Sequence, residues 1–194
     1  MPPAGQTPDH RRAVAERSIE AILDAAERLL ASGADASMSA VASEAGVSRV
    51  TLYSHFATRP QVLEAVAERV VGSGAEAIAA ANLGSGDPAE ALDRLIEAAW
   101  GKLDRNLQLF ASARAELSEE AIRRAHEQLD APILALIKRG RRAGAFRKDV
   151  PASWLLATYY ALMHAAAGEV TAGRLSASDA RTAVKSTIHS AFRG

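Results

Sequence analysis

The chain has 194 residues, enough for one domain or two small ones to bury a core without disulfides or metals. It has no cysteine, which excludes disulfide scaffolds, thiolate zinc sites, iron–sulfur clusters and cysteine nucleophiles. Its 23 basic side chains are balanced by 23 acidic ones, so overall charge does not indicate nucleic acid binding. We expect no cofactor and no metal, and any DNA contact must come from local placement of residues.

The N-terminus lacks the apolar run of a signal peptide, and no later stretch has the ~20 apolar residues that a membrane span needs. We therefore expect a cytoplasmic protein that does not enter a membrane. Alanine, the strongest helix former, is abundant, while alternating β-branched runs and Asn-Gly turns are missing from the sequence. This composition predicts an all-α fold.

The first predicted domain covers residues 15–71 and follows a flexible arm at residues 1–14. Apolar residues recur early in it at steps of three and four, which predicts an amphipathic helix that ends near Gly33. Ser37 and Ser48 each precede a short apolar segment, where a serine hydroxyl can cap the first turn of a helix. The sequence therefore predicts one long and two short helices in this region.

A fourth helix and two glycines mark the end of this first domain. Thr58 and Gln61 have the spacing of a capping box, which predicts that a helix starts there. Gly72 and Gly74 are expected to break the chain after that helix. We therefore place the domain boundary near Val71.

The second predicted domain covers residues 72–194 and is also helical. Pro88 fits the first turn of a helix. Ser118 and Gly144 fit the two ends of a long helix, which Pro132 should kink. The remaining helices are predicted at Leu107–Arg114, Pro151–Gly173 and Ser178–Phe192.

Between Ser37 and Phe56, three residues predict a helix-turn-helix. Ala42 is small enough for two helices to cross closely, Gly46 can adopt the positive φ of the turn, and Leu52 can pack back into the core. The outer face of the second helix is then free to enter the major groove of DNA. This arrangement indicates a DNA-binding protein.

The residues around this motif resemble the DNA-binding domain of the tetracycline-repressor (TetR) family. The resemblance covers about the first third of the chain and rests on three runs, Ala21–Leu30, Ser39–Ser48 and Thr51–Arg59. The chain departs from the family pattern at Val50, where a small residue is usual, and at Arg59, where lysine is usual. The resemblance implies an all-α, sequence-specific transcriptional regulator that binds a double-stranded DNA operator and is a repressor released by a small-molecule effector.

DNA contacts are predicted from side-chain chemistry and from the resemblance. Arg49 can donate two hydrogen bonds to a guanine edge or pair with a phosphate, and Val50 can contact a thymine methyl group. Ser48 can contact either a base edge or a phosphate. The resemblance assigns contacts with the DNA backbone to five further residues: Ser37, Thr51, Tyr53, His55 and Arg59.

The resemblance also implies roles for the second domain. In the family, two C-terminal helices of each subunit pair across a twofold axis, and the helices before them enclose a small-molecule pocket. We predict a homodimer formed through the apolar faces of the two closing helices: Leu155, Leu156, Tyr159, Leu162, Met163, Ala166, Ala180, Val184, Ile188 and Ala191. The predicted effector pocket is lined by large apolar residues and one histidine: Trp100, Leu103, Phe110, His126, Ile133, Trp154, Tyr159 and Met163.

Two other classes of function are weighed against this interpretation. The first is an all-α enzyme or small-molecule carrier with a vestigial helix-turn-helix. It is disfavoured because the sequence contains no phosphate-binding glycine loop and neither the G-x-S-x-G nor the H-E-x-x-H motif of common enzymes. A nonspecific architectural DNA binder would need a basic face, which the even charge balance disfavours. His126, His164 and His189 lie on separate predicted helices without metal-ligand spacing, so we predict no metal site.

Overall fold

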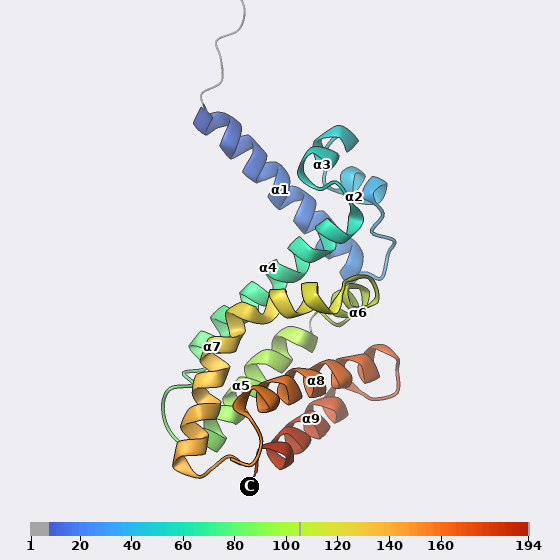
Figure 1. Ribbon diagram of the computed structural model, residues 1–194. Helices are drawn as coiled ribbons and strands as arrows, with labels where there is room; N and C mark the ends of the chain where they lie inside the picture. The colour runs from blue at the N-terminus through green and yellow to red at the C-terminus, as the bar shows by residue number, and fades with distance from the viewer. Residues whose placement is uncertain (1–7, 105, 194) are drawn as a thin grey trace, which may run out of the picture. The chain divides into compact units, whose positions relative to one another are not determined.

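The computed structural model describes residues 8–104 and 106–193, and these ranges form nine α-helices without a strand (Figure 1). The helices are α1 (Pro8–Ala31), α2 (Met38–Glu44), α3 (Arg49–His55), α4 (Arg59–Ala80), α5 (Pro88–Asp104), α6 (Leu107–Glu116), α7 (Glu119–Ala143), α8 (Ala152–Thr171) and α9 (Ala177–Phe192). The all-α prediction is confirmed. None of these helices is long and apolar enough to cross a membrane.

Helix α1 begins earlier than the sequence predicts. Residues 8–14 are helical, so the prediction of a flexible arm is wrong for that stretch, and residues 1–7 of the arm lie outside the described residues. Alanine, arginine and glutamate favour the helical state, and Arg12 donates from Nε to the Glu16 carboxylate one turn later at 2.9 Å. Helix propensity and this pair extend α1 beyond its core-facing part.

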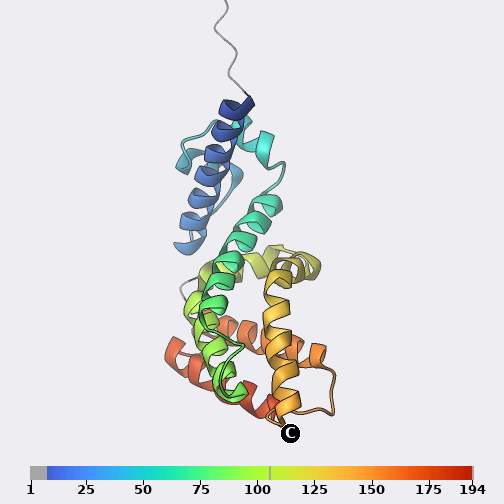
Figure 2. The same ribbon diagram turned by 90° about the vertical axis from the view of Figure 1, so that its left-hand side faces the viewer.

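Two compact units divide between Val66 and Ala67, and we call them the N-terminal unit and the C-terminal unit. The division falls within α4, which continues through Gly72 and Gly74 (Figure 1 and Figure 2). The predicted break at these glycines is therefore wrong. A glycine costs a helix interior only about 1 kcal/mol, and the burial of valine and isoleucine side chains on both sides of the pair outweighs that cost.

The core of the N-terminal unit draws on all of its helices. α1 packs against α2 and α3, and α2 packs against α3. The buried side chains are Ile22, Ala25, Ala26, Leu30, Val41, Ala42, Leu52, Val62, Leu63 and Val66. This small core holds α2 and α3 against α1 and leaves their outer faces exposed to solvent.

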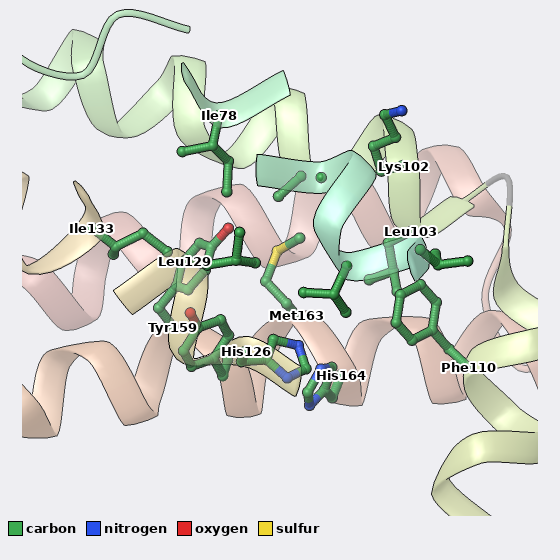
Figure 3. Close-up of a pocket in the computed structure, with 15 residues that line it drawn as sticks. Ile78, Lys102, Leu103, Phe110, His126, Leu129, Ile133, Tyr159, Met163 and His164 are labelled. Carbon is green, nitrogen blue, oxygen red and sulfur yellow. The ribbon is translucent and has the colours of Figure 1, made fainter. Parts of the chain in front are cut away.

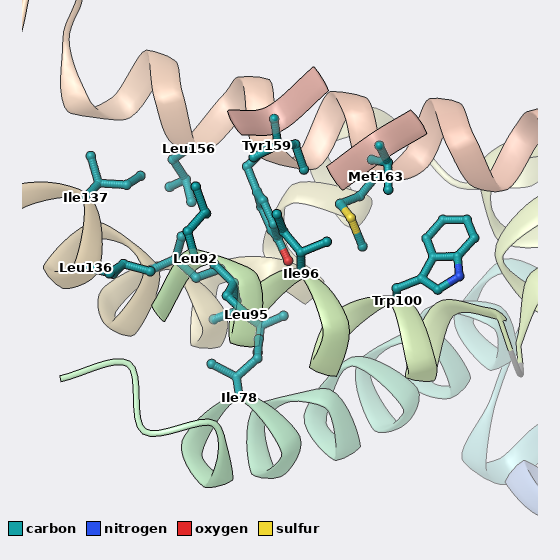
Figure 4. Packing of buried hydrophobic residues seen from close by; sticks show 14 of the residues in the cluster. Ile78, Leu92, Leu95, Ile96, Trp100, Leu136, Ile137, Leu156, Tyr159 and Met163 are labelled. Atoms are coloured by element: carbon teal, nitrogen blue, oxygen red, sulfur yellow. The ribbon is translucent and has the colours of Figure 1, made fainter. Parts of the chain in front are cut away.

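In the C-terminal unit, α8 and α9 form a helical hairpin on which α5 packs, and α7 packs against α5 and α8 (Figure 1). Figure 4 shows Leu92, Leu95 and Ile96 of α5 facing Leu156 and Tyr159 of α8. All five of these side chains are buried. The closing hairpin is therefore part of the core of its own chain.

The apolar faces predicted for dimerisation lie inside this core. Seven of the residues are buried within the chain, and the other three are half-buried against the same cluster. The buried ones are Leu155, Leu156, Tyr159, Met163, Ala180, Val184 and Ile188. The prediction of these residues as the dimer surface is wrong, because periodicity identifies an apolar face but not the body that covers it.

Helix α7 has the ends that the sequence predicts. The Ser118 hydroxyl accepts a hydrogen bond from the backbone N–H of Ala121 at 3.2 Å, and Gly144 adopts a φ of +79° just after the last turn. Pro132 lies inside the helix, and the ribbon bends part-way along (Figure 1). The bend fits the loss of one backbone hydrogen bond at a proline.

Candidate functional site

The two short helices α2 and α3 are fixed by local hydrogen bonds at their starts. The Ser37 hydroxyl accepts from the backbone N–H of Ala40 at 3.3 Å, and the Ser48 hydroxyl accepts from that of Thr51 at 3.0 Å. Gly46 turns the chain between the helices with a φ of +66°, a conformation that side chains with a Cβ disfavour. Both predicted caps and the predicted turn are confirmed.

The packing of the helix-turn-helix also matches the prediction. Ala42 is 2% exposed and Leu52 is fully buried, so the small residue of α2 and the apolar residue of α3 both lie in the core. Val47 and Phe56 are half-buried at the two ends of α3. This packing fixes the rotation of α3 about its axis and decides which side chains face outward.

The outward face of α3 presents Arg49, Val50 and Tyr53. Val50 is 79% exposed and Tyr53 is 46% exposed, so both side chains are accessible to a partner outside the chain. Arg49 is exposed, and no hydrogen bond or ion pair joins it to the part of the chain that the structure describes. Its guanidinium is therefore available to a partner outside the chain.

The remaining predicted DNA contacts are more enclosed. Ser37, Thr51 and His55 are half-buried. The hydroxyl of Ser48 lies 2.8 Å from that of Thr51 in addition to capping α3, so both hydroxyls already have partners within the helix. Ser48 and Thr51 therefore stabilise the start of α3 more than they extend from it.

Two arginines brace the helix-turn-helix in a way that the sequence did not indicate. Arg59, at the start of α4, donates from Nε to the carbonyl oxygen of Ala36 at 2.9 Å. Arg28 of α1 pairs with Glu44 of α2 at 3.0 Å. Because each pair joins residues far apart in the sequence, no local spacing signal could have found them.

A second candidate site is a cavity of about 70 Å³ in the C-terminal unit, lined by side chains from α4 to α8 (Figure 3). Six of the residues predicted for the effector pocket line it: Leu103, Phe110, His126, Ile133, Tyr159 and Met163. The sequence interpretation missed the contribution of α4, namely Val70, Val71, Gly74 and Ile78, and also missed Lys102 and Tyr160, whereas His164 was a candidate polar contact and does line the cavity. The predicted break at Gly72 and Gly74 divided this helix in two, so the sequence did not indicate that residues on both sides of the break share one face.

Neither tryptophan of the predicted pocket lines the cavity. Trp100 is buried, only 4% exposed, and lies at the end of the core cluster nearest Met163 (Figure 4). Trp154 is 63% exposed at the start of α8, next to Val150 and Pro151. Trp154 precedes the buried Leu155, and successive residues of a helix point about 100° apart, so it faces away from the core.

One part of the cavity wall is polar. The Nδ1 atom of His126 lies 2.7 Å from the carbonyl oxygen of Ile122, and its ring meets the His164 ring edge-on at a centroid distance of 5.1 Å. Burial lowers the pKa of His126, which favours the neutral ring that donates from Nδ1 to this carbonyl. The neighbouring Tyr160 hydroxyl donates to Asp130 at 2.9 Å, and burial raises the pKa of that tyrosine.

The described residues contain no cluster of three or more histidine, aspartate or glutamate side chains arranged to hold a metal ion. The cavity therefore offers apolar contacts, two imidazoles and one ammonium group to a ligand, while the face of α3 offers a guanidinium and an apolar surface. These two sites have the chemistry of a small-molecule pocket and of a DNA-reading helix.

Comparison with known proteins gives the same picture. The family model described as bacterial regulatory proteins, tetR family, matches residues 22–66, which include the helix-turn-helix. The HTH-type transcriptional repressor LfrR of Mycolicibacterium smegmatis is 31% identical over 151 residues, which are 77% of each protein. The chain belongs to the TetR family of bacterial regulatory proteins.

Solved structures of TetR-family proteins superpose on nearly the whole chain. A TetR-family transcription regulator from Shewanella sp. PV-4 is 26% identical with a TM-score of 0.70, covering 90% of this chain and 97% of its own. LfrR from Mycobacterium smegmatis, in complex with proflavine, is 26% identical with a TM-score of 0.66, covering 92% and 98%. The TetR-family chain is thus a DNA-binding transcriptional regulator, and the interpretation as an enzyme with a vestigial helix-turn-helix is set aside.

Proposed function

We propose that the chain represses transcription by binding, as a homodimer, an operator whose bases are read by Arg49 and Val50, and that a small molecule in the C-terminal unit releases it. The observation that carries this proposal is the exposed pair Arg49 and Val50 at the start of α3, of which Arg49 makes no hydrogen bond or ion pair with the described residues, on a helix held in place by the fully buried Leu52. An arginine at this position of a recognition helix can donate two hydrogen bonds to guanine.

The proposed roles on DNA follow the surroundings of each side chain. Arg49 and Val50 contact base edges, whereas Ser48 acts chiefly through its cap on α3. The backbone of the DNA is contacted from the N-terminal ends of α2 and α4, where free N–H groups favour a phosphate, and by three α3 residues. These backbone contacts are Ser37 and Arg59 at the helix starts, and Thr51, Tyr53 and His55 on α3.

The effector is proposed to bind in the cavity of the C-terminal unit. This proposal is supported by the solved structure of LfrR, a member of the family that binds the small molecule proflavine. In the present chain, α4 both begins in the N-terminal unit and lines the cavity with Val71, Gly74 and Ile78. A ligand that binds more tightly to one position of α4 stabilises that position by its difference in affinity for the two positions. Such a ligand therefore changes the affinity of the protein for DNA.

The homodimer is proposed to form through the outward faces of α8 and α9, because their inward faces are used in the core. Several of the exposed residues there are small, namely Ala157, Ala161, Ala165 and Gly168 on α8, and Ala183, Thr187 and Ser190 on α9. Small side chains let helices of two copies approach closely around a twofold axis. We expect Ala161→Arg to produce a monomer in sedimentation analysis, while Ala131→Arg on the exposed face of α7 leaves the dimer intact. A dimer that tolerates Ala161→Arg would contradict this interface.

Selection of bound fragments from random DNA with the purified protein tests the proposed operator. Arg49→Ala should relax the preference at one base pair and weaken the selected site by about 5- to 150-fold, which corresponds to ~1–3 kcal/mol for one lost base contact. Arg59→Ala should weaken all sites alike. If the protein fails to retard any DNA at low salt, where phosphate contacts are strongest, the proposal is wrong.

A further inference from the structure

The charge of the cavity wall restricts which small molecules it can hold. Among the described residues that line it, Lys102 alone carries a fixed charge, and the set includes neither aspartate nor glutamate. The nearby Asp130 is not in the cavity wall but lines an adjoining surface groove, which shares His126, Tyr160 and His164 with the cavity, and it accepts the Tyr160 hydroxyl at 2.9 Å. His126 is held neutral by burial. A cationic ligand would therefore lose its hydration without gaining a negative partner in the wall.

The position of Lys102 gives the cavity two chemically different ends. In Figure 3 its ammonium group turns away from Tyr159 and Met163, and it lies 3.5 Å from the Ser73 hydroxyl of α4. Lys102 is half-buried, so its charge stays at the edge while apolar and aromatic side chains fill the interior. A lysine ammonium on a four-carbon stem can follow a carboxylate placed beside it.

We propose that the cavity binds a small amphipathic carboxylate, with its acid group beside Lys102 and Ser73 and its apolar chain directed toward Tyr159 and Met163. This inference rests on the proposed function, because it names the chemical class of the effector for the same cavity. The wall offers a positively charged group no carboxylate.

The volume of the cavity limits the length of the apolar chain. The cavity measures about 70 Å³, whereas an engineered apolar cavity that holds benzene measures about 150 Å³. A chain of a few carbon atoms therefore fits without rearrangement. A longer chain has to displace Phe110 or the segment of α4 at Gly74, and such displacement is the change through which a ligand alters an equilibrium.

The inference is tested by measuring the binding of matched ligands to the full chain by calorimetry. The ligands are straight-chain carboxylates of four, six and eight carbons, each with the primary amine and the alcohol of the same length. At least one acid should bind about tenfold or more tightly than its amine, the effect expected of one charge-assisted hydrogen bond. Added salt should weaken the acid more than the alcohol, because the ion pair lies at the cavity edge.

Three variants assign the preference to one residue. Lys102→Met should remove the difference between the acid and the amine and keep the alcohol's affinity, and Lys102→Arg should retain the difference. Lys138→Met, on the exposed face of α7, is the matched control and should behave as the wild type. The inference is overturned if no acid binds more tightly than its amine, or if Lys102→Met leaves that difference unchanged.

Operator retardation, measured on the same samples, separates this inference from the proposed function. Each variant should retard the selected DNA as the wild type does, because Lys102 and Lys138 belong to the C-terminal unit. Retardation without any preference for acids overturns only the inference about the ligand. A chain that retards no DNA overturns the proposed function, whatever its ligand preference.

Discussion

The two units use their candidate contact residues in opposite ways. In the N-terminal unit, Arg49 and Val50 extend from α3 into solvent, and the buried Leu52 supports them from behind. In the C-terminal unit, the candidate contacts such as Ile133 and Tyr159 are themselves buried in the core, only 1% and 2% exposed. The difference indicates that DNA recognition can change without a loss of stability, whereas most changes of ligand preference also alter the core.

The largest expected effect separates the supporting residue from the reading residues in the N-terminal unit. Leu52→Ala should lower the free energy of unfolding by about 2–5 kcal/mol, the range for a buried leucine, and abolish operator retardation. Val50→Ala, at a position that is 79% exposed, should change stability by less than about 0.5 kcal/mol. Calorimetric unfolding measures both. Equal destabilisation by the two substitutions would contradict the comparison between an exposed site and an enclosed one.

Two glycines test the packing of the C-terminal unit. A Cβ at Gly140 would overlap the ring of Phe146, which is buried and meets Phe192 edge-on at 5.4 Å. Gly140→Ala should therefore cost about 1–3 kcal/mol, as overpacking does. A Cβ at Gly74 meets nothing within 4 Å, so Gly74→Ala should stabilise the chain by about 0.5–1 kcal/mol through helix propensity. Urea unfolding distinguishes the two signs, and a loss of stability in Gly74→Ala would mean that α4 needs glycine there.

The smallest expected effect is a pH dependence that comes from the cavity wall. Burial lowers the pKa of His126 in the folded chain, so the unfolded chain binds a proton at a higher pH than the folded one. The contribution of His126 is then present above the unfolded pKa of about 6.5 and is lost as the pH falls below it. His126→Gln should flatten the decline in stability below that pH. His10→Gln, at an exposed position of α1, should leave the decline unchanged.

The DNA-binding helices could be predicted almost completely, because their signals are local. Ser37 and Ser48 cap α2 and α3 at a distance of three residues, and Gly46 adopts the positive φ that its position requires. The outward direction of Val50 follows from the burial of Leu52, because residues two apart on a helix point to nearly opposite sides. What sequence spacing could not predict were the braces from Arg59 to Ala36 and from Arg28 to Glu44, which join separate elements.

The cavity could be predicted only in part, because its wall depends on which helix faces meet. Large apolar residues were easy to find, and five of the seven predicted ones line the cavity, together with the predicted His126. The sequence gives the same indication for both tryptophans, since each is a large aromatic residue of the second domain. Trp154 faces solvent, however, whereas Trp100 is buried in the core. Nothing in the sequence indicated that Lys102 lines the cavity, because a lysine on a helix is usually a solvated charge.

The sequence by itself determined the fold class, the ends of most helices and the residues available to read DNA, because caps, turns and periodicity act over three or four residues. The tertiary structure alone decided that α4 continues through Gly72 and Gly74, and that the apolar faces of α8 and α9 are covered by their own chain. It also decided the charge of the cavity. These features depend on contacts between helices distant in sequence, and burial energy there exceeds the small local preferences that a sequence displays.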